Sequence, residues 1–463
     1  MRRRRARTLR GHLPEIDATD TIAAIATPPG TGAIAVVRLS GPNARALAAR
    51  LAPAASPLRP RLATYATIHD EDGHAIDRGL VLLFARPHSY TGEDVVEFQL
   101  HGSPVVAREL MRALIACGAR PAAAGEFSRR ALLNGKMDAH AAAAVADLIA
   151  AETRSAARAA AANLAGGLAP EIEALRARLA TALEDLAAAV DFPDEVPDPD
   201  RARLAVTLDE IVERLQALLR EGEAGRIVRE GVSVAIVGPP NAGKSSLLNA
   251  LLGHERAIVS EMAGTTRDTI EERLSIDGVA VRLVDTAGIR AHAGHLEAAG
   301  IERTRHALET ARIALVVVDG SRPPSPEAVA LLHQTRGRER VVFFNKADLG
   351  DGARAEAPEG AVWGSARDPA TLEPLRREIA RTGWGGTLPD LERPHLASVR
   401  ELGAVADAVD ALGRARATVG SGEPVDFAVG ELQRAFKALG HVSERIAAEE
   451  VLDGIFSRFC IGK

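Results

Sequence analysis

The stretch GPPNAGKS, from Gly238 to Ser245, decides the fold of the central part of this chain. It fits the pattern GxxxxGK[ST], follows a β-branched run that starts at Val232, and precedes the apolar helical pattern SLLNALL at 246–252. Glycines in such a loop let backbone N–H groups surround a phosphate at a helix N-terminus, while Lys244 adds a positive charge and Ser245 offers a hydroxyl to Mg²⁺. The segment therefore predicts a strand, a phosphate-binding loop and a helix.

Three further motifs follow in the order expected of a guanine-nucleotide site. DTAG at 285–288 ends an apolar run and places an acid near the magnesium and a flexible peptide near the γ-phosphate. NKAD at 345–348 ends another such run, and its carboxylate can accept two N–H donors of a guanine edge, which adenine does not present. SAR at 365–367 fits a backbone contact to guanine, so the four motifs together predict a GTP-binding domain. The predicted nucleotide contacts are Asn241, Ala242, Gly243, Lys244, Ser245, Ser246, Asp285, Thr286, Ala287, Gly288, Asn345, Lys346, Asp348, Ser365, Ala366 and Arg367.

The same motifs indicate how hydrolysis differs from that of many signalling GTPases. In those proteins a glutamine after DTAG orients the attacking water, but this chain has Ile289 there, which cannot hydrogen-bond water. No side chain of the phosphate loop is an obvious arginine finger, so another charge has to neutralise the β- and γ-phosphates. Asn241 can lend its amide oxygen to a monovalent cation at that place, or it can make only a local turn hydrogen bond. Spacing alone favours the two interpretations equally.

The rest of the chain divides by composition and periodicity. Strand-like and helical segments mix before Leu133, an alanine-rich helical region follows, and the chain is helical again from Arg393. We predict an α/β and all-α multidomain fold, in which a Ras-like P-loop GTPase domain with a mostly parallel sheet is inserted into a discontinuous helical domain. The predicted parts are a basic disordered extension (1–16), an α/β domain (17–132), the two halves of the helical domain (133–228 and 389–463) and the GTPase domain (229–388).

Two kinds of periodicity support this division. In GEDVVEFQLHG (92–102) three apolar side chains fall on one strand face and three polar ones on the other, namely Val96, Phe98 and Leu100 against Glu97, Gln99 and His101. Apolar residues that recur every three or four positions predict two core-facing helices, with stripes Ile172, Leu175, Leu179, Leu183, Leu186 and Val190, then Leu204, Leu208, Ile211, Leu215 and Leu218. Both stripes are more simply helix-bundle core than any ligand site.

Charge and cysteine content narrow the class of protein. The formal charge of −5 offers no broad basic surface for nucleic acid, so any RNA contact has to be local or shared with another protein. No apolar run approaches the about 18 residues of a membrane span. Two distant cysteines, Cys117 and Cys460, indicate a reducing compartment, and we predict a cytoplasmic protein. The six arginines of residues 1–10 suit a targeting presequence, a nucleic-acid arm or a disordered extension, which we favour because no long amphipathic pattern follows.

Several longer blocks resemble one family. They are ATPPGTGAIAVVRLSG (26–41), SYTGEDVVEFQLHG (89–102), GEFSRRALLNGKMDAH (125–140) and the terminal FCIGK (459–463). With the GTP-binding motifs, they make the chain similar to the MnmE/TrmE family of tRNA uridine-modifying GTPases from Asp20 to Lys463. The resemblance implies that the N-terminal α/β domain binds folate, that the protein is a homodimer, and that it forms a complex with the FAD-containing protein MnmG.

The resemblance also implies the reaction. The two proteins together would alter carbon 5 of the wobble uridine of certain tRNAs by adding a (carboxymethyl)aminomethyl group. The one-carbon unit would come from a tetrahydrofolate derivative, in its 5,10-methylene or 5-formyl form. GTP would be hydrolysed with Mg²⁺ and K⁺, while FAD and NADH would act through the partner.

Binding residues follow from the positions that match the family's motifs. The positions that match folate contacts are Arg38, Glu97, Lys136 and Lys463. The positions that match the potassium site are Asn241 and the backbone carbonyls near Ser260, Met262 and Thr265, and those that match the magnesium ligands are Ser245 and Thr266. For Arg38 and Glu97, the strand alternation by itself fits a solvated strand face equally well.

Two more positions match catalytic residues of the family. Glu297 matches a glutamate that positions the hydrolytic water through a bridging water, although the stretch AHAGHL before it lacks the acidic residues common there. Read without the family, Glu297 is a solvated helix residue. Cys460 matches a C-terminal cysteine implicated in the modification chemistry, and the alternative is that Phe456, Phe459 and Cys460 anchor the tail in the helical core.

Two other functions fit part of the pattern. A ribosome-assembly GTPase shares every GTP-binding motif, but it normally carries a second such domain or a KH module with a GXXG clamp, and the sequence has neither. That function leaves the N-terminal blocks and the cysteine tail unexplained. A folate-dependent one-carbon enzyme with a regulatory GTP-binding domain is the third possibility, and it is distinguished by modification that does not depend on GTP.

Overall fold

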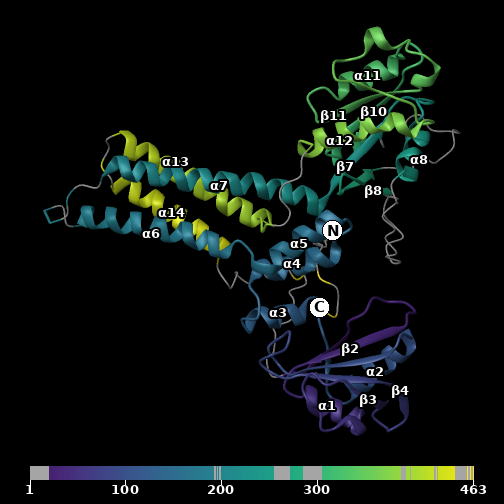
Figure 1. Cartoon of the computed structure of the whole chain (residues 1–463), viewed down its shortest axis with the longest axis vertical. Coiled ribbons are helices and arrows are strands. Elements are labelled where there is room, and N and C mark those ends of the chain that lie inside the picture. The colour runs from purple at the N-terminus through teal and green to yellow at the C-terminus, as the bar shows by residue number, and fades with distance from the viewer. Residues whose placement is uncertain are drawn as a thin grey trace, which may run out of the picture. The chain divides into compact units, whose positions relative to one another are not determined.

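The computed structural model forms two compact units, Met1–Ala146 with Ser443–Lys463, and Asp147–Val442 (Figure 1). The structure describes residues 20–462 apart from 192–193, 196, 198–199, 255–271, 285–304, 387–392, 397, 422–423, 425, 444–455, 457–458 and 460–461. The basic extension predicted for residues 1–16 lies outside the described residues. In the part of the chain that is described, no helix is long and apolar enough to cross a membrane.

The first unit is built on a six-stranded sheet in the order β3-β4-β5-β2-β1-β6. Its strands are β1 (Ile22–Ile25), β2 (Ile34–Ser40), β3 (Thr64–His69), β4 (Ala75–Phe84), β5 (Val95–His101) and β6 (Arg120–Pro121). All neighbours are antiparallel except β1 and β6. Helices α1 (Ala44–Leu51) and α2 (Pro104–Ala116), with the short η1 (Pro53–Ala55), share one buried core with the sheet.

Strand β5 has the alternation that its sequence predicts. Phe98 and its two apolar neighbours on the same face are buried, whereas Glu97 is half-buried and His101 is exposed. Strand β2 alternates in the same way, and the antiparallel register places Arg38 directly opposite Glu97. The predicted strand faces are therefore confirmed, and the register adds the cross-strand pair.

The C-terminal tail packs within the first unit. Phe456 and Phe459 are buried with side chains of α3 (Glu126–Leu133) and α4 (Ala139–Ala150). Gly125, at φ +68°, precedes α3 in left-handed backbone, and a Cβ there would lie 2.9 Å from the Phe456 ring atom Cδ1. Glycine at this position therefore lets the tail approach the start of α3 closely.

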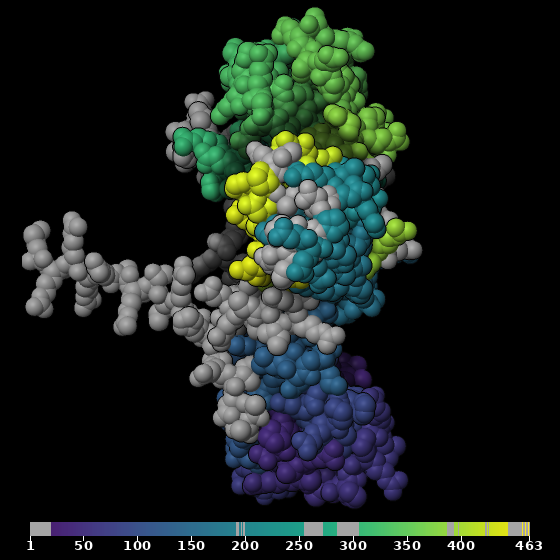
Figure 2. Space-filling model, turned by 90° about the vertical axis from the view of Figure 1, so that its left-hand side faces the viewer, coloured from purple at the N-terminus to yellow at the C-terminus, as the bar shows by residue number. Residues whose placement is uncertain are grey.

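The helical part of the second unit joins segments that are far apart in sequence. Its helices are α5 (Arg154–Gly166), α6 (Ala169–Asp191), α7 (Arg201–Glu230), α13 (Val399–Ser421) and α14 (Asp426–Ser443). Apolar residues of α6, α7, α13 and α14 form one buried cluster, and the four helices run side by side in Figure 1. In Figure 2 the yellow atoms of the later helices lie next to the blue-green atoms of the earlier ones. Both predicted stripes face this cluster, except that Val190 is 40% exposed near the end of α6.

The rest of the second unit is a six-stranded sheet in the order β12-β11-β10-β7-β9-β8. Its strands are β7 (Val232–Val237), β8 (Glu272–Ile276), β9 (Val279–Val284), β10 (Ile313–Asp319), β11 (Arg340–Asn345) and β12 (Val362–Trp363). Only the β8–β9 pair is antiparallel among the described pairs, so the prediction of a mostly parallel sheet is confirmed.

Helices cover both faces of this second sheet. Helix α8 (Lys244–His254) and helix α12 (Glu373–Trp384) share a core with one face, and helix α11 (Pro326–Gln334) packs on the other. Short 3₁₀ turns complete the connections, namely η2 (Ala347–Leu349), η3 (Arg354–Glu356) and η4 (Pro369–Leu372). A parallel sheet covered on both sides explains why its strands read as continuous apolar runs.

Candidate functional site

The predicted phosphate loop joins the end of β7 to the start of α8. A Cβ at Gly238 would lie 2.3 Å from the backbone oxygen of Val317 in β10, so only glycine fits there. Lys244 turns back over the loop, and its Nζ donates to the backbone oxygens of Gly238 and Pro239 at 2.8 and 2.9 Å. Burial lowers the pKa of the Lys244 ammonium. The geometry holds a lysine nitrogen inside the curve of the loop, where phosphate oxygens would accept its protons.

Asn345, at the end of β11, ties three segments of the candidate site together. Its side chain is almost fully buried, its Nδ2 donates to the Ala242 oxygen at 2.9 Å, and its Oδ1 accepts from the Ala366 nitrogen at 2.9 Å. A Cβ at Gly243, which has φ +94°, would lie only 2.2 Å from that Nδ2. The contact therefore requires glycine in the phosphate loop, and it links the predicted guanine-reading loops to the phosphate loop.

Lys346 is positioned by a residue that the sequence motifs did not identify. Its backbone is left-handed at φ 64°, and its Nζ lies 2.7 Å from Oδ2 of Asp319, the last residue of β10. Burial raises the pKa of the Asp319 carboxyl, but hydrogen bonds from Lys346 and Ser321 outweigh this and leave that pKa below its usual value. The signal was present in the sequence, because Asp319 ends an apolar run as Asn345 does.

The remaining guanine-reading residues lie at the same edge of the sheet. Asp348 is exposed in η2, directly after Lys346 and Ala347. The nitrogen of Ser365 donates to Thr371 Oγ1 at 2.8 Å, and Ser365 Oγ accepts from the nitrogen of Arg367 at 3.2 Å. These bonds fix the loop after β12, whose Ala366 is held by Asn345.

Asn241 occupies a strained position at the tip of the phosphate loop. Its φ is +62°, a left-handed conformation that asparagine tolerates better than most residues, and the residue is exposed. Among the described residues its side chain makes no hydrogen bond, so the local turn bond considered from the sequence is not formed there. The amide oxygen is therefore free of that alternative role.

Several predicted site residues lie outside the described residues. They are Ser260, Met262, Thr265, Thr266, Asp285, Thr286, Ala287, Gly288, Glu297, Cys460 and Lys463. The described parts of the nucleotide site are thus the phosphate loop, the start of α8 with the exposed Ser245 and Ser246, and the two guanine-reading loops.

A second cluster lies on the sheet of the first unit, around Arg38 and Glu97. Arg38 Nε and a terminal guanidinium nitrogen lie 2.9 and 2.8 Å from Glu97 Oε1, and the two side chains are only 16% and 15% exposed. The Arg38 guanidinium also lies 5.7 and 5.8 Å from the ring centres of Tyr90 and Phe127. This is an enclosed ion pair flanked by aromatic rings, not the solvated strand face considered from the sequence.

Lys136 lies beside Gly92, two residues after the Tyr90 that flanks Arg38. The side chain of Lys136 is exposed, and a Cβ at Gly92 would lie 3.2 Å from its Cε. Tyr90 is fixed by a 2.7 Å hydrogen bond between its hydroxyl and Ser128 Oγ, and burial raises the pKa of that hydroxyl. Arg38 and Lys136 thus each lie beside the segment 90–92, and Glu97 is paired with Arg38.

A buried arginine supports this cluster, and the motifs did not single it out. Arg130 is 2% exposed and is ion-paired with Asp20, Glu93 and Glu126. Burial raises the pKa of the Glu126 carboxyl, but hydrogen bonds from Arg120, the Ala123 nitrogen and Arg130 outweigh this and keep that pKa low. Glu126 and Arg130 lie in the block GEFSRRA (125–131), whose repeated charges could have signalled the network, whereas Asp20 and Glu93 lie far from it in sequence.

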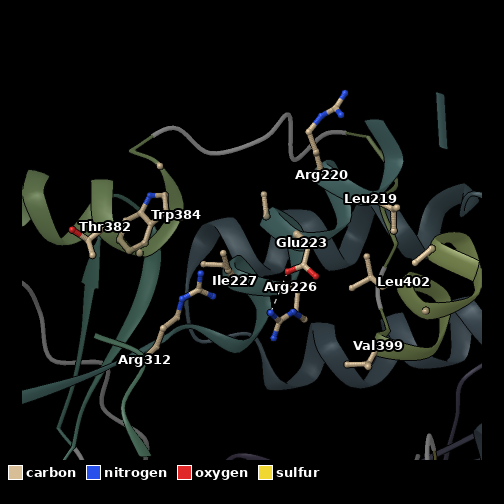
Figure 3. A pocket seen from close by; sticks show the side chains of 15 residues that line it. Leu219, Arg220, Glu223, Arg226, Ile227, Arg312, Thr382, Trp384, Val399 and Leu402 are labelled. Atoms are coloured by element: carbon tan, nitrogen blue, oxygen red, sulfur yellow. Dashed lines mark hydrogen bonds and ion pairs between the residues drawn. The ribbon is translucent and has the colours of Figure 1, made fainter. Parts of the chain in front are cut away.

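A cavity in the second unit is lined by other described residues. It has a volume of about 990 Å³ and is lined by α7, α12 and α13, with Trp384 and Arg312 on one side and Leu402 on the other (Figure 3). Among the described residues, none that is predicted to bind nucleotide or folate lines it. The described residues that are predicted to bind nucleotide or folate lie elsewhere, most of them on the loops that follow β7, β11 and β12 and on strands β2 and β5.

A phosphate loop at the end of a central parallel strand, tied by Asn345 to the loops that would read a guanine, defines a P-loop GTP-binding protein. Residues 21–136 match the family model described as GTP-binding protein TrmE N-terminus, and residues 140–460 match the MnmE helical domain. The chain belongs to the MnmE/TrmE family of tRNA modification GTPases.

Curated relatives match over nearly the whole chain. The proteins named tRNA modification GTPase MnmE from Akkermansia muciniphila and Chloroflexus aurantiacus are each 42% identical, over 96% of this chain and 100% of their own length. A solved structure, the G domain of the T. maritima FeoB iron transporter, covers 33% of this chain and 98% of its own at 23% identity. Its TM-score of 0.24 is too low to support an inference about this chain.

Proposed function

We propose that this chain is a cytoplasmic, potassium-activated GTPase that adds a (carboxymethyl)aminomethyl group to carbon 5 of the wobble uridine of certain tRNAs. It would act as a homodimer with an FAD-containing MnmG partner that uses NADH, and would take its one-carbon unit from a tetrahydrofolate derivative. The observation that carries the proposal is that the same chain has two separate candidate binding sites. One is the set of loops that Asn345 joins by hydrogen bonds, and the other is the enclosed ion pair of Arg38 and Glu97. A ribosome-assembly GTPase has no use for the second site.

The GTP site supports the proposed hydrolysis through its own residues. Lys244 would neutralise phosphate charge, and the Asp348 carboxylate would accept the guanine N–H donors. Ser245 with Thr266 would hold Mg²⁺, and Asn241 with nearby backbone carbonyls would hold K⁺. The two cations would supply positive charge beside the phosphates.

Asp348→Asn is expected to weaken GTP binding roughly 10- to 100-fold and to shift preference toward xanthosine triphosphate, because an amide presents a donor where guanine also donates. Competition of both nucleotides against a labelled GTP analogue measures the change. Asp351→Asn, in the exposed loop just beyond, is the matched control and should bind GTP normally. Unchanged selectivity in the Asp348 variant would show that this carboxylate does not read the base.

The cluster around Arg38 and Glu97 in the first unit supports the proposed folate binding, because one carboxylate oxygen of Glu97 can still accept hydrogen bonds. Both contacts from Arg38 go to Oε1 of Glu97, so among the described residues Oε2 keeps its lone pairs for a ligand N–H. A pterin ring offers N–H donors and a flat face, which the Tyr90 ring matches in shape.

Two residues of the C-terminal motif, Phe459 and Gly462, are described, and both lie in the first unit. A Cβ at Gly462 would lie 2.4 Å from the backbone oxygen of Ile25, and Ala24 beside it is the register partner of Arg38. Phe459, the residue directly before Cys460, is buried with Phe456 against side chains of α3 and α4. The positions of Phe459 and Gly462 support the proposal that Lys463 contacts the folate and that the Cys460 thiol reacts close to it.

Cys460→Ser is expected to abolish the tRNA modification while GTP hydrolysis stays within about twofold of the wild type, because the serine keeps the size of the side chain and weakens the nucleophile. The measurements are nucleoside analysis of tRNA in a deletion strain and GTP turnover of the purified variant. Cys117→Ser, half-buried near the core of the first unit, is the control. Normal modified uridine in the Cys460 variant would make the tail structural and remove its catalytic role.

A further inference from the structure

Arginines gather at one end of the sheet in the first unit. The members of this basic edge are Arg45 on α1, Arg59 and Arg61 before β3, and Arg86 after β4, and all four are exposed. The two stretches that carry them, 41–69 and 78–92, contain six arginines and neither aspartate nor glutamate. Because the whole chain has a net charge of −5, this excess of positive charge is local.

Contacts along the end of β4 hold Arg61 in place. Its backbone nitrogen donates to the Leu83 oxygen at 2.8 Å, and its guanidinium donates to the His88 oxygen at 3.1 Å. The same guanidinium lies 5.9 Å from the centre of the Phe84 ring. Arg61 is thus fixed beside the loop that carries Arg86.

One carboxylate joins that loop to α1. The backbone nitrogen of Arg86 donates to Asp94 Oδ1 at 2.9 Å, and Arg45 Nε lies 2.8 Å from the other oxygen of Asp94. Burial raises the pKa of Asp94, but the bonds from Arg45 and Arg86 outweigh this and keep that pKa low. Asp94 is therefore ionised at neutral pH, and Arg45 is the one member of the basic edge with which it is ion-paired among the described residues, while its charge also acts on Arg86.

The other charges of the basic edge remain available. Among the described residues, the guanidinium groups of Arg59 and Arg86 make no hydrogen bond or ion pair. Such groups pair well with phosphate, because a planar guanidinium can donate two parallel hydrogen bonds to it. Four exposed arginines with one carboxylate, Asp94, among them keep a net positive charge, which is suited to a polyanion with regularly spaced charges.

We propose that the basic edge binds the phosphate backbone of the tRNA substrate. This rests on the proposed function, which makes tRNA the substrate, and it names the surface that receives the RNA. The net charge of −5 leaves no broad basic surface, so an RNA contact made by this chain itself has to be local, and the basic edge is such a local patch. The patch positions the RNA and does not read its sequence.

The test compares two double variants of the full-length protein. Arg59→Gln with Arg86→Gln removes two charges from the basic edge, and Arg108→Gln with Arg203→Gln removes two exposed arginines elsewhere. Each protein is titrated with fluorescently labelled tRNA between about 50 and 200 mM salt. The basic-edge variant is expected to bind at least about fivefold more weakly at the lowest salt, with a slope of log K against log salt smaller by about 1.5.

The control variant should match the wild type, and GTP hydrolysis should be unchanged in both. Equal tRNA affinity and salt slope in the basic-edge variant would overturn the proposal. So would normal tRNA binding combined with lost binding to the MnmG partner, which would assign the edge to an acidic protein surface. A different experiment tests the proposed function. If the wild-type protein fails to restore the modified uridine in a deletion strain, that function is contradicted, whatever the result of the tRNA titration.

Discussion

GTP hydrolysis by this chain is expected to fall by about 10³–10⁵-fold when potassium is replaced by sodium, the range that a missing arginine finger gives in other GTPases. Ile289 takes the place of the glutamine that orients water elsewhere, and no arginine of the phosphate loop can serve as a finger. Asn241 is exposed at the tip of that loop in a left-handed conformation and makes no competing hydrogen bond among the described residues. A cation there would replace the missing positive charge.

The measurement is steady-state GTP turnover at constant ionic strength with either salt. Asn241→Ala should lose most of the potassium stimulation and retain the low rate seen in sodium. The control is nucleotide affinity, which should differ little between the salts because the cation acts mainly on the transition state. Equal turnover in the two salts would contradict the potassium site.

Glu297→Ala is expected to lower GTP turnover by at least about 10²-fold and to leave GTP affinity nearly intact, because the proposed role of the carboxylate is to position the attacking water. Single-turnover hydrolysis and binding of a labelled GTP analogue measure the two quantities. Glu302→Ala, five positions further along the chain, is the matched control. Normal turnover in the Glu297 variant would place water positioning on another residue.

The sequence predicted the elements of this fold better than their long-range contacts. Strand β5 was predicted from its alternation, and helix α7 from its apolar stripe, because each pattern reflects one buried face. The pair of Arg38 and Glu97 could not be predicted as a pair, since it depends on the register between β2 and β5. Val190 departs from its stripe because the end of α6 leaves the buried cluster.

The candidate nucleotide site shows the same limit. Its motifs fix the residue types at short spacing, so Lys244 and Asn345 could be named from the sequence. The bridge from Asn345 to the phosphate loop and the pairing of Lys346 with Asp319 join segments that only the order of the parallel strands brings together. Such contacts follow from topology, which a linear pattern does not contain.

Nucleoside analysis of tRNA tests the proposed function most directly. The gene is expressed in a strain that lacks its own MnmE-family protein but retains the MnmG partner, and total tRNA is digested and separated by mass. We expect the wobble uridine with a carbon-5 (carboxymethyl)aminomethyl group to reappear with the wild-type chain and to stay absent with Arg38→Ala, which removes the enclosed ion pair of the first unit. Continued absence of the modified uridine with an expressed, GTP-hydrolysing wild-type chain would contradict the proposed function.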